Sequence, residues 1–289
     1  MKKDIDRYCG TKRIAVLITC YNRKDHTLGC LECLFKNQPP VGFSLEAFLV
    51  DDGSTDGTSQ AIRNAYPDVN IIQGDGSLFW NGGMRMAFSA AIQQGFDYYL
   101  WLNDDTKLYD DTLSRMLATE KLAREEHNAE VIVVGATRDP EGDRQTYGGL
   151  VAVDRWKPLK FSFVKISEQY SVCDTMNGNC VLIPKSVVDV IGNLDKAFVH
   201  AMGDIDYGLR AKRAGFLVVA MAGYAGECSQ NCLANTHIDV SLGRMERFKK
   251  VSSNKELPLK SWYVFTKRNA GVMWPVYFAW PYVKVLLGR

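Results

Sequence analysis

Short apolar runs alternate with helical segments through the first half of the chain. The runs 13–19 (RIAVLIT), 45–50 and 98–102 (YYLWL) have the length and apolarity of buried strands. A helix over 24–37 should end before Pro39-Pro40, because proline cannot continue a helix. The remaining expected elements are strands at 70–73 and 130–136 and helices near 59–65, 82–95 and 108–124. Strands that alternate with helices predict βαβ units and a mainly parallel sheet.

The pattern changes after Pro140, where glycine and polar residues become more frequent and the expected strands are shorter and more antiparallel. Beyond the apolar run 181–184, the expected elements are helices at 185–191 and 204–214 and a strand at 216–220. We expect one continuous α/β domain over residues 1–240. Its nucleotide-binding half would span about 11–137 and its acceptor-binding half about 138–240, with a basic, aromatic extension over 241–289.

Composition places the chain among ordinary globular proteins. Its 289 residues are 46% hydrophobic, which is enough for one elaborated domain. No apolar run reaches the roughly 18 residues that a membrane span needs, and the polar N-terminus lacks the apolar core of a signal peptide. We therefore expect a cytoplasmic protein. Its eight cysteines, among them a helical Cys30/Cys33 pair and Cys228/Cys232, are expected to be reduced thiols.

Charge is unevenly distributed along the chain. From Ile238 to the end there are ten Lys/Arg and three Asp/Glu, a balance of +7, so the preceding residues carry 25 basic and 30 acidic groups, a balance of −5. The extension also has aromatic residues between its basic ones, which suits a bilayer interface. Peripheral contact with the inner membrane surface is the prediction, and packing of the extension on the domain is the alternative. A nucleic-acid partner would need a broader basic field.

Three polar clusters follow predicted strands, at Thr19–Arg23, Asp51–Ser54 and Asn103–Asp105. Ligands of open α/β sheets bind beyond the carboxyl ends of the strands, so these clusters should meet in one crevice. A nucleotide-sugar donor would need positive charge there, because its diphosphate leaving group is an anion. The chain has no glycine-rich phosphate loop. A divalent cation held by Asp104 and Asp105 is the alternative source of charge, although turns also use adjacent aspartates.

Four motifs, TCYNR, VDDGSTDGT, LNDDT and MGDIDYGLRAKRAG, occur in that order between residues 13 and 240. Together they resemble the family 2 glycosyltransferases, and most of all the bacterial rhamnosyltransferase-like branch that builds surface polysaccharides. The resemblance implies a GT-A fold and an inverting transfer from a UDP- or dTDP-sugar to a hydroxyl of a glycan acceptor, which could be lipid-linked. It also implies Mn²⁺ or Mg²⁺ as cofactor.

The resemblance assigns roles to the residues of these motifs. Those that would bind the nucleotide are Thr19, Tyr21, Asn22, Arg23, Asp52 and Asp104. Asp105 would bind the metal, and Asp104 would contact ribose or metal. Asp204 takes the position of the catalytic base, with Asp206 as the second candidate. An inverting displacement needs such a carboxylate on the acceptor side, although Asp204 could also be a helix N-cap.

Two positions depart from the family pattern and five side chains are assigned more loosely. Asn103 stands where many relatives begin a DxD triplet, and Gly203 stands where the family often has Glu. The loop 74–83 offers candidate donor-sugar contacts, namely Asp75, Trp80 and Asn81. His237 is a candidate metal ligand and His200 a candidate acceptor contact, and each could instead be a structural histidine.

Two other functions stay open on the sequence. A sugar-nucleotide nucleotidyltransferase shares the α/β plan and the metal, but it would want a glycine-rich, basic loop after the first strand, where this chain has TCYNRKDH. A non-catalytic glycan-binding pseudoenzyme is kept open by the departures at Asn103 and Gly203. Metal-dependent donor hydrolysis or transfer would separate these cases.

Overall fold

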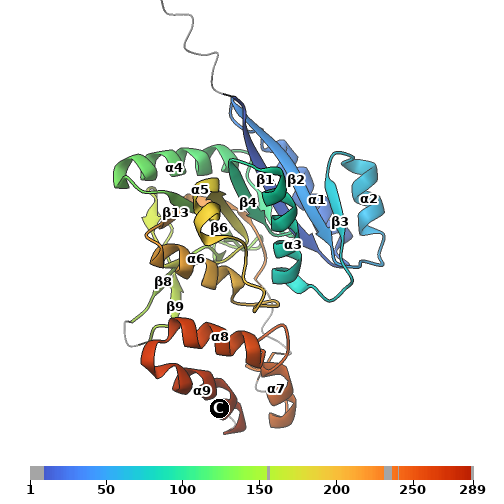
Figure 1. Cartoon of the computed structure of the whole chain (residues 1–289). Coiled ribbons are helices and arrows are strands. Elements are labelled where there is room, and N and C mark those ends of the chain that lie inside the picture. Colours follow the sequence, from blue (N-terminus) through green and yellow to red (C-terminus); the bar gives the residue numbers. More distant parts are fainter. Residues whose placement is uncertain (1–9, 155–156, 231–235, 240, 288–289) are drawn as a thin grey trace, which may run out of the picture.

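The computed structural model describes residues 10–154, 157–230, 236–239 and 241–287, and it has a large central sheet between helices (Figure 1). The strands of that sheet are β1 (Lys12–Cys20), β2 (Phe43–Asp51), β3 (Asn70–Gln73), β4 (Tyr98–Leu102), β5 (Lys107–Leu108), β6 (Val131–Arg138), β7 (Gln145–Tyr147), β10 (Ser171–Val172), β12 (Cys180–Pro184) and β13 (Leu217–Glu227). A small second sheet has β8 (Gly149–Ala152), β9 (Phe161–Phe163) and β11 (Thr175–Met176). The helices are α1 (Lys24–Lys36), α2 (Thr58–Ala65), α3 (Phe79–Gln94), α4 (Thr112–His127), α5 (Lys185–Ile191), α6 (Gly203–Arg213), α7 (Arg244–Val251), α8 (Leu259–Asn269), the 3₁₀ turn η1 (Gly271–Met273) and α9 (Trp274–Leu286).

The order of the large sheet is β10-β13-β6-β12-β4-β1-β2-β3. Strands β3, β2, β1 and β4 are mutually parallel, as the βαβ pattern predicts. β12 enters antiparallel between β4 and β6, and β13 is parallel to β6. The carboxyl ends of β1, β2 and β4 therefore lie at one edge of the sheet, which is where the three polar clusters sit.

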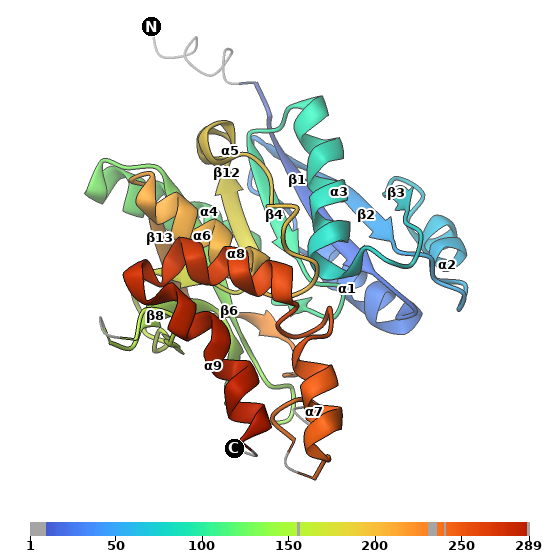
Figure 2. The same ribbon diagram turned by 60° about the horizontal axis from the view of Figure 1, so that its bottom comes forward.

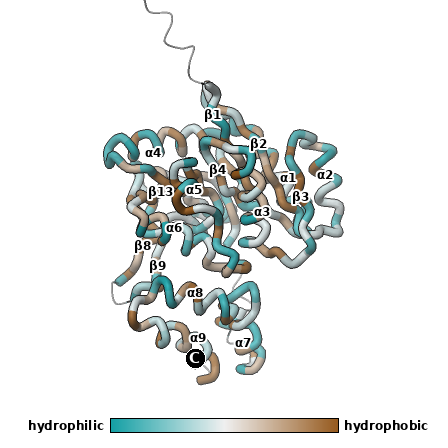
Figure 3. The backbone as a smooth tube through the Cα atoms, viewed as in Figure 1, coloured by the Kyte–Doolittle hydropathy of each residue, from teal (hydrophilic) through white to brown (hydrophobic). Residues whose placement is uncertain are grey.

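The two faces of the sheet bury two separate hydrophobic cores. Alternate residues of β1 point to opposite faces, with Ile14 and Val16 in one core and Ala15 and Leu17 in the other. The first core is closed by α1 and α4, and the second by α3, α5 and α6. Figure 2 shows α3 and α6 on one face, and in Figure 3 hydrophobic colour recurs along the strands between the helices.

The extension is helical and packs on the domain. Helices α7, α8 and α9 lie together below the sheet in Figure 1, and α8 runs beside α6 in Figure 2. Trp262, Phe265 and Tyr282 form a third buried cluster with Phe198 and Met202, which precede α6. The alternative that the extension packs on the domain is confirmed for the residues of this cluster. α9 continues through Pro281, which lies inside the helix.

The elements differ from the sequence predictions in a few places. α3 begins at Phe79, three residues early. α4 begins only at Thr112, because residues 107–108 form β5 and pair with β13. The six cysteines in the described residues are free thiols as expected, while Cys9 and Cys232 lie outside them. In the described residues no helix has the length and apolarity to cross a bilayer.

Candidate active site

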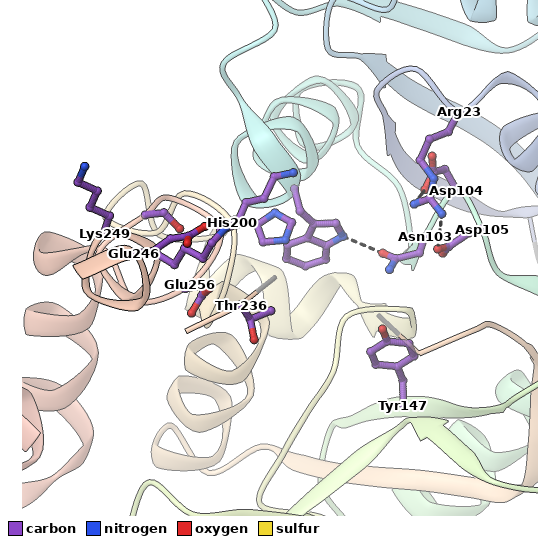
Figure 4. Close-up of a pocket in the computed structure, with 14 residues that line it drawn as sticks. Arg23, Asn103, Asp104, Asp105, Tyr147, His200, Thr236, Glu246, Lys249 and Glu256 are labelled. Carbon is purple, nitrogen blue, oxygen red and sulfur yellow. Dashed lines mark hydrogen bonds and ion pairs between the residues drawn. The ribbon is translucent and has the colours of Figure 1, made fainter. Parts of the chain in front are cut away.

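A cleft opens beyond the carboxyl ends of β1, β2 and β4. It consists of two adjoining cavities of about 840 and 450 Å³. The two cavities share five lining residues, Arg23, Trp80, Asp104, His200 and Lys255. Figure 4 shows Arg23, Asp104 and Asp105 on one side and residues of the extension on the other. The predicted convergence of strand ends is therefore confirmed for β1, β2 and β4.

An acidic pair follows β4 and lines the cleft. Arg23 donates from Nη1 to Asp104 Oδ1 at 3.2 Å and from Nη2 to Asp105 Oδ2 at 2.7 Å. Asp104 is 5% exposed, and its Oδ2 is buried without a hydrogen-bond partner. Burial raises the pKa of Asp104 to about 7, against the lowering effect of Arg23. One oxygen of this carboxylate is thus bonded to Arg23, while the other has no donor to stabilise its charge.

Asn103 has a structural role that the sequence did not reveal. Its Oδ1 accepts a hydrogen bond from Trp80 Nε1 at 2.7 Å, and its backbone N–H donates to the Asn179 carbonyl. Trp80 is further held edge-on against the buried Trp101, with 6.2 Å between ring centroids. The amide at position 103 therefore fixes an aromatic ring in the cleft, beside the acidic pair.

Asp52 lines the smaller cavity, and it organises the loop 74–79. Its Oδ1 accepts the Gly76 N–H at 2.9 Å, and its Oδ2 accepts the N–H groups of Leu78 and Phe79 at 3.0 and 3.1 Å. A Cβ at Gly74 would lie 2.6 Å from Asp52 Oδ1, so only glycine permits this approach. Most of the hydrogen-bonding capacity of Asp52 is thus used within the protein, which leaves one lone pair of Oδ1 for a nucleotide.

The end of β1 contributes Thr19 and Tyr21 to the wall of the smaller cavity, where Tyr21 is 53% exposed. Asn22 is not among the lining residues. Its N–H donates to Ser54 Oγ at 2.8 Å, and its Oδ1 accepts the Thr55 N–H at 2.7 Å. That Asn22 binds nucleotide stays a prediction. Asn22 joins the β1 end to the turn after β2.

Three non-glycine residues around the cleft have left-handed backbone, Asn22 (φ 50°), Phe79 (φ 53°) and Met202 (φ 72°). Asparagine tolerates this conformation, but it is strained for phenylalanine and methionine. Such strain persists only where surrounding contacts hold it, and it gathers at functional sites. The positions follow β1, begin α3 and precede α6, so strain accompanies each loop that shapes the cleft.

Asp204 stands at the start of α6, behind the wall of the cleft. Its Oδ1 accepts the Ile205 N–H at 2.8 Å and its Oδ2 accepts the Gly178 N–H at 2.9 Å. A Cβ at Gly178 would lie 2.6 Å from the Trp80 ring and 3.2 Å from Asp204 Cβ, so Asp204 is next to Trp80. Burial raises its pKa, against these N–H donors. Asp204 itself does not line either cavity.

Gly203 is required by a close contact with Asn81. A Cβ at position 203 would lie 1.8 Å from Asn81 Oδ1, which explains why this chain has no larger residue there. Asn81 is fully buried, and its Nδ2 donates to the carbonyls of Asp195 and Phe198. The prediction that Asn81 contacts donor sugar is wrong, because its side chain is used to hold the segment before α6.

Asp206 is a structural ion pair and not a second base. It is fully buried, and both of its oxygens accept from Arg268 Nη1 at 2.8 Å. Its Oδ2 also accepts from Arg210 Nε at 2.9 Å. Arg268 also reaches Asp195 from α8. Asp206 therefore secures the extension to α6.

Two further predicted contacts lie outside the lining of the cleft. Asp75 is exposed, lines neither cavity, and accepts from the N–H and hydroxyl of Ser77 in a turn. His237 Nδ1 is bonded to Glu256, and the residue lines a separate groove with Trp280. Among the described residues no three His, Cys, Asp or Glu side chains gather as a metal site. His237 therefore does not join Asp105 in a ready-made ligand set.

His200 and Lys255 are better placed than the sequence indicated. His200 lines both cavities, and its Nδ1 is buried without a hydrogen-bond partner. Burial, and after it the nearby Lys255, lower the pKa of His200, which favours the neutral imidazole. Lys255 comes from the extension, and only the overall basic charge of the tail hinted at it. Together they bring an imidazole and a cation to the cleft.

Comparison with known proteins agrees with this architecture. The structure resembles a mannosyltransferase from Pyrobaculum calidifontis, solved with GDP-Man and Mn²⁺, at a TM-score of 0.56 and 15% identity, covering 96% of this chain and 73% of that one. It also resembles S. aureus TarS, solved with UDP, at a TM-score of 0.54 and 13% identity, covering 88% and 70%. These likenesses confirm the predicted GT-A type fold.

A sequence relative is the N-acetylglucosaminyl-diphospho-decaprenol L-rhamnosyltransferase of Mycobacterium tuberculosis, 26% identical over 199 residues. That match spans 61% of this chain and 63% of the relative, less than two thirds of its length. The family model described as "Glycosyl transferase family 2" matches residues 15–205, which include every strand-end cluster of the cleft and Asp204. With most of the chain, the three strand-end clusters and Asp204 inside one family match, the protein belongs to glycosyl transferase family 2.

Proposed function

We propose that this protein is an inverting glycosyltransferase that moves a sugar from a UDP- or dTDP-sugar to a hydroxyl of a glycan acceptor. The observation that carries the proposal is the cleft at the ends of β1, β2 and β4, which joins an acidic pair to an aromatic ring and a histidine with an unpartnered Nδ1. The family match argues against a nucleotidyltransferase. The relative's name includes a diphospho-decaprenol acceptor, so we propose a lipid-linked acceptor here, used in surface polysaccharide synthesis on the cytoplasmic face of the membrane.

The acidic pair fits a divalent cation. Asp104 has a buried oxygen without a partner, and Asp105 follows it directly. Mg²⁺ and Mn²⁺ favour sites with one or two carboxylates completed by phosphate oxygens and water. Asp104 and Asp105 would hold the ion, which when bound supplies positive charge to the departing diphosphate. Arg23 pairs with both carboxylates, so it would have to shift toward a phosphate when the ion is present.

The other residues of the cleft bind and orient. Trp80, held by Asn103, offers a flat face to a sugar ring. Tyr21, at the rim of the smaller cavity, can stack on the base, and Thr19 and Asp52 lie beside it. Lys255 can pair with a phosphate, since no carboxylate is bonded to it in the described residues.

The acceptor proton requires a base. We retain Asp204 for this role, because burial raises its pKa and it lies next to Trp80. Each of its oxygens accepts one backbone N–H and keeps a lone pair, and because Asp204 lines neither cavity an acceptor would have to reach it past Trp80 and Gly178. His200 is the second candidate, favoured by its unpartnered Nδ1 in the cleft.

The test is a thermal-shift panel of nucleotides and nucleotide sugars, with and without Mn²⁺, followed by transfer assays. The correct donor should raise the melting temperature more with Mn²⁺ than without it. Asp204→Asn should keep donor binding and lose transfer, while the exposed control Asp110→Asn should keep both. If Asp204→Asn still transfers and His200→Gln does not, the base is His200. Donor binding without any hydrolysis or transfer would indicate a glycan-binding pseudoenzyme and refute the proposal.

A further inference from the structure

The last helix is apolar around its whole circumference. Between Gly271 and Leu287 the one charged residue is Lys284. Phe278, Tyr282 and Val285 face inward and pack in the third hydrophobic cluster. A surface helix that only packs on a domain normally presents polar residues on its outer side. The outer side of α9 does not follow that rule, so packing on the domain does not account for it.

The outward side of α9 forms a continuous apolar stripe. Val276 is 55% exposed, Trp280 51%, Val283 40% and Leu287 59%, and their spacing of three or four residues aligns them on one face. η1 continues the stripe with Val272, which is 94% exposed. Figure 3 shows hydrophobic colour at the C-terminal end of α9. Single exposed apolar residues are ordinary, but a contiguous stripe marks an interaction surface.

Cationic and aromatic side chains border this stripe. Lys284 lines a groove beside Trp280. Near the start of α9, Lys267 lies 5.3 Å from the ring centroid of Tyr263, which contacts Trp274 edge-on at 5.3 Å. Residues 257–289 contain five Lys/Arg and no Asp or Glu. Tyrosine and tryptophan with flanking lysines suit the boundary between water and lipid, and unopposed cations suit anionic headgroups.

We propose that the stripe of η1 and α9 inserts into the headgroup boundary of an anionic bilayer and docks the protein on the membrane. A second copy is the less suitable occupant. A two-fold interface through the stripe would bring the Lys267 and Lys284 borders of both copies together, with no acid from residues 257–289 between them. Docking deepens the proposed function, because Lys255 and Glu256 of the same extension line the cleft where a lipid-linked acceptor would enter. The docking itself needs no substrate.

The experiment is flotation of the full chain with vesicles of phosphatidylcholine alone or with about 30% phosphatidylglycerol. The wild-type protein should float with the anionic vesicles, and more weakly with neutral ones. Val276→Asp/Val283→Asp should lower binding by roughly tenfold per side chain. The matched control is Leu122→Asp on α4, where the leucine is 56% exposed, and it should bind like wild type. Lys267→Gln/Lys284→Gln should remove the preference for anionic vesicles.

Three outcomes would overturn the docking proposal. The first is a wild-type protein that does not bind anionic vesicles. The second is a folded Val276→Asp/Val283→Asp variant that binds them as well as wild type does. The third is a wild-type dimer in light scattering that this variant no longer forms, although its vesicle binding is unchanged. Circular dichroism establishes that each variant is folded. Donor hydrolysis is measured on the same preparations without vesicles. Hydrolysis without vesicle binding would refute docking alone, and vesicle binding without hydrolysis would refute only the enzymatic proposal.

Discussion

Replacing Gly203 by alanine tests how tightly the segment before α6 is packed. The new Cβ would lie 1.8 Å from Asn81 Oδ1 and 2.8 Å from its Cγ. Asn81 cannot move freely, because it is fully buried and its Nδ2 donates to two backbone carbonyls at 2.9 and 3.0 Å. Overpacking costs about 1–3 kcal/mol, and the two strained hydrogen bonds add about 1 kcal/mol each. Against this, alanine improves a helix by at most about 1 kcal/mol over glycine.

We therefore expect Gly203→Ala to lower the free energy of unfolding by about 2–4 kcal/mol, measured by urea denaturation. Gly142→Ala is the matched control, since its Cβ would meet nothing within 4 Å, and it should change stability by less than about 0.5 kcal/mol. Asn81→Ala should relieve part of the clash, so the double variant should be less destabilised than the sum by about 1 kcal/mol or more. A stable Gly203→Ala, or strict additivity, would refute this packing argument.

Three further predictions concern the ion pair, the acidic pair and the aromatic wall. Arg268→Met should cost about 2–4 kcal/mol in urea denaturation, because buried Asp206 loses the bonds of both its oxygens to Arg268; a loss below about 1 kcal/mol would contradict this. The pKa of Asp104 is about 7 in the folded protein, against 3.8 when unperturbed. Between these two pH values the folded state keeps a proton on Asp104 that the unfolded state has lost. This group therefore makes the metal-free protein less stable as the pH rises from about 4 to about 7. Cation binding needs the ionised form, so the Mn²⁺ concentration at half-saturation in thermal shift should be about tenfold higher at pH 6 than at pH 8, and a pH-independent value would refute it. Trp80→Phe removes the 2.7 Å bond to Asn103 and should reduce kcat/KM for transfer about 5–10-fold in a folded protein, whereas unchanged kinetics would exclude a positioning role.

Local pattern was sufficient for most of the fold. Strands β3 and β4 and helix α5 have the predicted bounds, because short apolar runs and proline breaks are signals that neighbouring residues decide. The convergence of strand ends followed from the parallel arrangement. The insertion of β12 between β4 and β6 could not be predicted, since strand pairing over such separations depends on the whole sheet.

The hydrogen-bond partners of the side chains in the site could not be predicted from the sequence. Asp75 and Asn81 looked like ligand contacts because they lie in a loop with several glycines, and Asn22 because it belongs to the TCYNR motif, yet each is bonded to the protein's own backbone. The role of Gly203 became visible only when Asn81, over a hundred residues away, was placed beside it. Local sequence gives the residue type, whereas tertiary packing decides whether its hydrogen bonds are already satisfied.

This distinction separates acids that the motifs presented alike. Asp52 accepts three backbone N–H groups, and Asp206 is bonded to two arginines, so the protein already stabilises the charge on both. Asp104 has a buried oxygen with no partner and a raised pKa, so its charge is stabilised least. A buried polar group without a partner costs stability, and natural proteins keep such groups where a ligand completes them. If the acidic pair binds a cation, that binding should offset the cost of the unpartnered oxygen. Asp104→Asn should then raise the free energy of unfolding of the metal-free protein and abolish the stabilisation by Mn²⁺.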